Sequence, residues 1–142
     1  TNMEFGELLK QFLIDLQSVF RTQLKKLDLT LSQIILISSI PIGGIDMTTL
    51  SIKIGVDNST LTRLIDILIK NGIVKKNKNP KDKRSFIVTV TEKGEFLQSK
   101  IELEIESFVT KIFQKTSSVD QEELKKNLSS FHWIVSKYNL NN

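Results

Sequence analysis

The feature that most constrains this fold is a short break between two helical patterns in the middle of the chain. The patterns span residues 48–54 and 58–71, and only the sequence Gly-Val-Asp at positions 55–57 separates them. Glycine readily adopts the left-handed conformation that ends a helix, and Asp57 or Asn58 can cap the next one. Two helices joined by so short a turn are typical of a helix-turn-helix unit.

Residues that favour β-structure follow this helix pair. Ile73–Asn77 and Phe86–Val90 are two such runs, and the second is rich in β-branched side chains. Between them, residues 78–85 are polar and include Pro80. We expect a β-hairpin with a long basic loop at its tip.

Helical patterns precede the middle region. Apolar residues recur at helical spacing from Phe5 to Leu27. Thr30 and Gln33 then form a capping box for a second helix, which has to stop before Pro41.

Two further helices are predicted after the hairpin. Thr91 can cap a long helix that runs to about Lys115, and Ser118 or Asp120 can begin the last one. The last helix repeats apolar residues at spacings of four and three, as in a helix that packs along another helix. This seam consists of Leu124, Leu128, Phe131, Val135 and Tyr138. The fold class is therefore mainly α with a small β-hairpin wing (α+β).

Charge is concentrated in the middle of the chain. Residues 53–84 carry nine basic and three acidic side chains, a local charge of +6, whereas the other residues carry 11 basic and 13 acidic ones, a charge of −2. A basic middle between weakly acidic ends indicates that the middle meets a polyanion.

Composition argues against most catalytic chemistry. The chain has no cysteine and one histidine, His132, so thiolate chemistry and a multi-histidine zinc site are excluded. No glycine-rich phosphate loop or nucleophile–base pair is visible, and we expect neither an enzyme nor a cofactor. No apolar run reaches membrane-spanning length and no secretory signal is present, so we expect a cytoplasmic protein without membrane contact.

Several motifs together resemble the MarR family of winged helix-turn-helix transcription regulators. The segment 50–68, LSIKIGVDNSTLTRLIDIL, is similar to the family's helix-turn-helix. The similarity continues through Asn-Gly-Ile-Val at 71–74, Asn-Pro-Lys-Asp-Lys-Arg at 79–84 and Thr-Glu-Lys-Gly at 91–94. The resemblance covers about residues 29–97 by motif and the whole chain by the order of its helices. The chain departs from the family pattern in having Ser51 where alanine is common and Lys76 where arginine is frequent.

The resemblance implies a domain organisation and a function. Residues 29–91 would form the winged helix-turn-helix DNA-binding domain, and residues 3–28 and 92–142 a helical dimerisation region. The implied function is a homodimeric, sequence-specific regulator, usually a repressor, on a pseudo-palindromic operator in double-stranded DNA. A small-molecule effector between the wing domain and the dimer helices would release it. Two alternatives remain: a monomeric helical bundle, and a winged-helix protein-interaction module without DNA binding.

Two sets of residues are candidates for DNA contact. The start of the recognition helix, which reaches deepest into a major groove, carries the first set: Asn58, Ser59, Thr60, Thr62 and Arg63. The hairpin carries the second: Lys76, Lys78, Lys81, Asp82, Lys83 and Arg84. By resemblance, Arg84 enters a minor groove and Asp82 steadies it. The alternatives are a solvated helix face and a hairpin loop kept polar for solubility.

Overall fold

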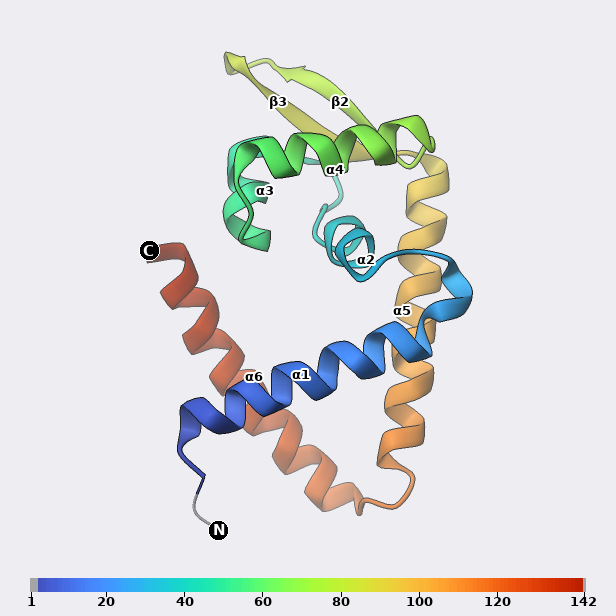
Figure 1. The fold of residues 1–142 in the computed structure, drawn as a ribbon, viewed down its shortest axis with the longest axis vertical. Coiled ribbons are helices and arrows are strands. Elements are labelled where there is room, and N and C mark those ends of the chain that lie inside the picture. The colour runs from blue at the N-terminus through green and yellow to red at the C-terminus, as the bar shows by residue number, and fades with distance from the viewer. Residues whose placement is uncertain (1–2, 142) are drawn as a thin grey trace.

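The computed structural model describes residues 3–141 and places six α-helices and a small sheet at the positions that the sequence patterns indicate (Figure 1). The elements are α1 (Phe5–Gln23), the 3-10 helix η1 (Lys25–Leu27), α2 (Leu31–Ser38), β1 (Ile45–Asp46), α3 (Met47–Ile54), α4 (Asn58–Lys70), β2 (Val74–Asn79), β3 (Asp82–Val90), α5 (Glu92–Phe113) and α6 (Ser118–Asn141). The sheet, α3 and α4 lie at one end of the molecule, and α1 crosses α6 toward the other; α5 connects the two ends (Figure 1). The predicted fold class is confirmed.

The predicted helix caps are present. The Thr30 hydroxyl accepts the backbone N–H of Gln33 (3.1 Å), and the Gln33 side chain accepts the N–H of Thr30 (3.0 Å), so the capping box is complete. α2 ends at Ser38, before Pro41. Thr91 caps α5 by accepting the N–H of Gly94 (3.1 Å).

The helix-turn-helix has the predicted turn. Gly55 ends α3 with a φ of 73°, a conformation that a residue with a side chain rarely adopts. Of the two candidate caps for α4, Asp57 is the one used. Ser51 is buried, and its hydroxyl donates to the carbonyl of Thr48 (2.7 Å), so a small residue at this position fits the close packing of α3.

The sheet differs from the prediction in two ways. Its strand order is β1-β3-β2, all antiparallel, and the two-residue strand β1 was not predicted. The long loop predicted for residues 78–85 is wrong, because β2 extends to Asn79 and β3 begins at Asp82. The Asn79 side-chain amide donates its N–H to the Ser85 hydroxyl (3.1 Å). The side-chain oxygen of Asn79, Oδ1, accepts the backbone N–H of Lys81 (3.0 Å). These bonds close the hairpin into a tight turn.

One hydrophobic core joins the helix-turn-helix to the sheet and α5. α4 contributes Leu61, Ile65 and Leu68, which are fully buried, and β3 contributes Val88. α5 is also held to α2 by polar contacts: the Gln98 amide donates to the carbonyls of Ile37 and Ile40, both at 2.9 Å. The remaining core members are Leu24, Ile34, Leu36, Ile37, Ile40, Leu50, Ile73, Val74, Ile101 and Phe108.

The outer helices are covered far less. Neither α1 nor α6 contains a buried residue in a single chain. Their only aromatic contact with each other in residues 3–141 is the edge-to-face pair Phe5–Phe131, with ring centroids 5.2 Å apart. Large exposed apolar side chains on the two helices include Leu8, Leu9, Phe12, Leu13, Leu124, Leu128, Trp133, Val135 and Tyr138. None of the helices in residues 3–141 combines the length and apolar character that a membrane crossing requires.

Gly94 is a position where the fold leaves no room for a side chain. A Cβ added there would collide with the carbonyl oxygen of Ile73 and lie 3.0 Å from Cβ of Val90. We therefore expect Gly94→Ala to lower the free energy of unfolding by about 2 kcal/mol, measured by urea denaturation. The matched control is Gly6→Ala in α1, where no atom lies within 4 Å of the added Cβ. The control should be neutral or slightly stabilising, and equal effects of the two substitutions would contradict the packing described here.

Candidate nucleic-acid interface

The start of α4 is built around the Asp57 carboxylate. Asp57 accepts the backbone N–H of Thr60 (2.7 Å) and the hydroxyl of Ser59 (2.9 Å) on the same oxygen, Oδ1. The Thr62 hydroxyl donates to the carbonyl of Asn58 (2.8 Å). Because a carboxylate already occupies the amide end of this helix and both hydroxyl protons are donated within it, the cations farther along α4 are the better donors to an incoming phosphate or base.

Four of the five predicted recognition-helix residues are exposed. They are Asn58, Ser59, Thr62 and Arg63, whereas Thr60 is half-buried. Ser59, Thr62 and Arg63 line a shallow depression along the outer face of α4. The structure therefore gathers most of the predicted set on one accessible face and turns Thr60 partly toward the protein.

The depression also contains residues that the sequence prediction left out. Asp66, Ile67 and Lys70 line it together with the predicted residues. Asp66 and Lys70 follow Arg63 by three and seven positions, and this helical spacing was the available signal. Ile67 also follows Arg63 by four positions and so lies on the same face. It was left out because an apolar residue is not expected on the polar face of a helix.

The tip of the wing is fully accessible. Lys81, Asp82, Lys83 and Arg84 are all exposed, and 93% of the Arg84 side chain is open to solvent. The Asp82 carboxylate accepts the backbone N–H of Arg84 at 3.1 Å and its Nε at 3.5 Å. The carboxylate orients the base of the arginine side chain and leaves both terminal guanidinium nitrogens free of it.

The two wing lysines on β2 have different surroundings. Lys76 and Lys78 are paired with Val88 and Phe86 in the sheet register, so both lie on the face of the hairpin that carries the core residue Val88. The Lys76 ammonium lies 4.8 Å from the centroid of the Phe86 ring, and its side chain is half-buried. Lys78 is exposed. Of the two, Lys78 is the more accessible cation.

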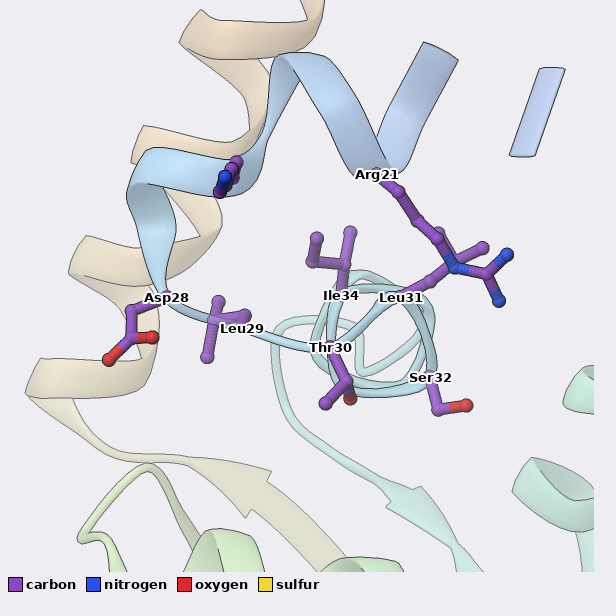
Figure 2. Close-up of a pocket in the computed structure, with 8 residues that line it drawn as sticks. Arg21, Asp28, Leu29, Thr30, Leu31, Ser32 and Ile34 are labelled. Carbon is purple, nitrogen blue, oxygen red and sulfur yellow. The ribbon is translucent and has the colours of Figure 1, made fainter. Parts of the chain in front are cut away.

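A separate cleft lies where α1 and η1 meet the start of α2. It has a volume of about 460 Å³ and is lined by Arg21 of α1, residues of the η1–α2 connection, and the start of α2. Figure 2 shows the Arg21 side chain extending over the beginning of α2, where Thr30 and Ser32 lie. The Arg21 guanidinium also bonds to the Gln17 side chain. Across residues 3–141, no three His, Cys, Asp or Glu side chains come close enough to hold a metal ion.

Comparison with known proteins finds one protein family that matches part of the chain. The sequence profile of the MarR family matches residues 29–86, the stretch that holds α2, the helix-turn-helix and most of the wing. Residues 29–86 of the chain are therefore similar to the MarR family.

Similar proteins of known sequence and structure agree with this similarity. The HTH-type transcriptional regulator BilQ of Clostridioides difficile is 33% identical over 82 residues, which are 58% of this chain and about half (55%) of BilQ. The HTH-type transcriptional regulator YhbI of Bacillus subtilis is 24% identical over 78% of this chain and 72% of its own length. The crystal structure of wild-type MarR from E. coli in its apo form matches with a TM-score of 0.81 and 22% identity, over 92% of this chain and 98% of that one. This structural match establishes the winged-helix fold.

The two aspartate caps of the helix-turn-helix predict a pH dependence. The backbone N–H of Thr49 is the main cause that lowers the pKa of Asp46, and the N–H of Thr60 does the same for Asp57. Because both folded pKa values lie below the unfolded value of about 3.9, the caps stabilise the fold above that value. Their contribution is lost as the pH falls from about 4 through the folded pKa values.

We therefore expect the double variant Asp46→Asn/Asp57→Asn to lose less stability than the wild type on acidification. Asparagine caps helices well but stays neutral, so it keeps the hydrogen bond without the titration. The measurement is the free energy of unfolding from urea denaturation at a series of pH values between about 3 and 7. An unchanged pH dependence in the double variant would contradict the role assigned to the caps.

Proposed function

We propose that this chain is a member of the MarR family and a sequence-specific, DNA-binding transcription regulator, a binding protein rather than an enzyme. The observation that carries the proposal is the separation of two surfaces. The accessible polar face of α4 and the basic wing lie at one end of the molecule, and the apolar faces of α1 and α6 lie toward the other (Figure 1). The names of BilQ and YhbI as transcriptional regulators support the same function.

In this proposal α4 enters the major groove. A B-DNA major groove admits one α-helix, and the donors and acceptors of the base edges there differ between base pairs. The exposed Ser59 and Thr62 hydroxyls and the Arg63 guanidinium supply short and long contacts to bases and phosphates. Asn58 and Thr60 complete the proposed set at the start of the helix.

The wing would reach the adjacent minor groove. The Arg84 guanidinium is the most suitable group, because it is exposed at a hairpin tip and held at its base by Asp82. A narrow minor groove attracts an inserted arginine through its negative potential. Lys76, Lys78, Lys81 and Lys83 would contact phosphates, which adds affinity but no sequence preference.

The apolar outer helices support a homodimer. In this proposal residues 3–28 and 92–142 form the dimerisation region, and residues 29–91 form the DNA-binding domain. The seam of α6 and the leucines and phenylalanines of α1 leave apolar surface exposed to solvent. This surface is more extensive than the isolated apolar side chains that are normal on a monomer. Two copies related by a two-fold axis would place two α4 helices in successive major grooves of a pseudo-palindromic operator, where a bound dimer represses transcription.

The cleft between α1 and α2 offers a place for control by a small molecule. It lies where the helical region meets the helix-turn-helix region, and Arg21 provides a cation at its edge. An effector that binds the cleft better in one arrangement of the two regions would shift the population away from the DNA-binding arrangement. Such a regulator would act in the cytoplasm together with its DNA.

Replacement of the wing arginine tests the proposal. We expect Arg84→Ala to weaken binding to a duplex selected by the wild type from a random library by one or more kcal/mol, measured by mobility shift. The slope of log affinity against log salt should also become shallower, because the variant brings one cation fewer to the polyanion. The control is Lys115→Ala, which removes a cation from the α5–α6 connection at the opposite end of the molecule (Figure 1).

The control should bind like the wild type. Binding by Arg84→Ala that equals the wild type would refute the wing assignment. Affinity that stays flat between low and moderate salt would refute the electrostatic basis of the whole proposal.

A further inference from the structure

One apolar side chain stands inside the polar face of α4. Ile67 is 40% exposed and lines the shallow depression together with Arg63, Asp66 and Lys70. Ser59 and Thr62 complete the lining. Ile67 is therefore the single apolar residue in a surface otherwise made of hydroxyls and charges.

The hydrophobic core does not account for Ile67. α4 is anchored by Leu61, Ile65 and Leu68, which are fully buried, and Ile67 belongs neither to the core nor to the partly buried residues packed against it. Isoleucine is also a poorer helix former than alanine. Neither packing nor helix propensity explains a large β-branched side chain at this place.

A second isoleucine on the same helix has a similar exposure but a different position. Ile69 is 38% exposed and does not line the depression. Two residues along an α-helix correspond to a rotation of about 200°. Ile69 therefore points away from the face that carries Ile67. Because the two isoleucines are about equally exposed, Ile69 is a matched control for substitution of Ile67.

The chemistry of the major groove supplies a partner for an exposed aliphatic side chain. Among the groups that base pairs present there, the C5-methyl of thymine is the apolar one. Ile67 follows Arg63 by four positions, so the two side chains are neighbours on one face, one helical turn apart. Resting on the proposed DNA-binding function, we propose that Ile67 is a specificity-determining residue that contacts a thymine methyl group next to the site contacted by Arg63.

The surroundings of Ile67 sharpen this preference. Arg63 and Lys70 lie on either side of it along the helix and hold that stretch against the polyanion. A cytosine in place of the thymine would remove the methyl group and place an amino donor against isoleucine, which accepts no hydrogen bond. Contact with the methyl group therefore selects thymine over cytosine at that base pair.

Replacement of thymine by deoxyuridine removes only the methyl group and tests the contact directly. The probe is a duplex selected by the wild-type protein from a random library, in which each thymine of a half-site is replaced in turn by deoxyuridine, symmetrically in both half-sites. Burial of one methyl group corresponds to about a fourfold change in binding constant, so the symmetric replacement should weaken wild-type binding about 15-fold at one position. Ile67→Ala should bind the thymine and deoxyuridine duplexes equally at that position, and Ile69→Ala should keep the wild-type sensitivity.

The outcomes separate the two proposals. A wild-type protein that selects a duplex but is insensitive to every deoxyuridine replacement overturns the role of Ile67, and so does an Ile67→Ala variant that keeps the full sensitivity. In both cases the DNA-binding function stands. A wild-type protein that selects no duplex overturns the proposed function itself. Circular dichroism and thermal unfolding of both alanine variants confirm that they are folded before binding is compared.

Discussion

The junction at Thr91 holds the wing and the end of α4, the elements proposed to contact DNA, to the rest of the molecule. The Thr91 hydroxyl donates to the carbonyl of Gly72 (2.6 Å), and its backbone N–H donates to the carbonyl of Ile73 (3.0 Å). The same hydroxyl accepts the N–H of Gly94 and so begins α5. The end of α4, the start of β2, the end of β3 and the start of α5 therefore meet at one threonine, and the close approach of α5 to Ile73 requires a glycine at position 94.

This junction explains how two surfaces of different chemistry are arranged in one small chain. α5 begins at the wing and runs to the outer helices, so a single helix connects the wing and the end of α4 to the helical region. Gln98 adds a second connection, because its amide donates to the last carbonyls around the end of α2. The helical region and the helix-turn-helix region are thus joined by hydrogen bonds as well as by the shared core.

The sequence predicted those features of the fold that depend on interactions between residues close together in the chain. Thr30, Asp57 and Thr91 cap helices as expected because capping depends on residues within three positions of each other. The pairing of β1 with β3 was missed because two residues carry no periodic signal. The tight wing tip was missed because it depends on the Asn79–Ser85 hydrogen bond, which forms only once the strands are paired. Within the candidate site, Arg63 and Arg84 were accessible to sequence reasoning through their motifs, whereas the cleft at Arg21 depends on how α1 packs against α2.

In the proposed complex, two copies of the chain bind one DNA duplex through both α4 and the wing. The decisive measurement is a hydroxyl-radical footprint of the wild-type protein on a duplex that it has selected. We expect two protected regions related by two-fold symmetry, with their centres about one helical turn apart, and protection of a minor groove beside each region. Protection of a single half-site, or of no defined region, would contradict the proposed complex.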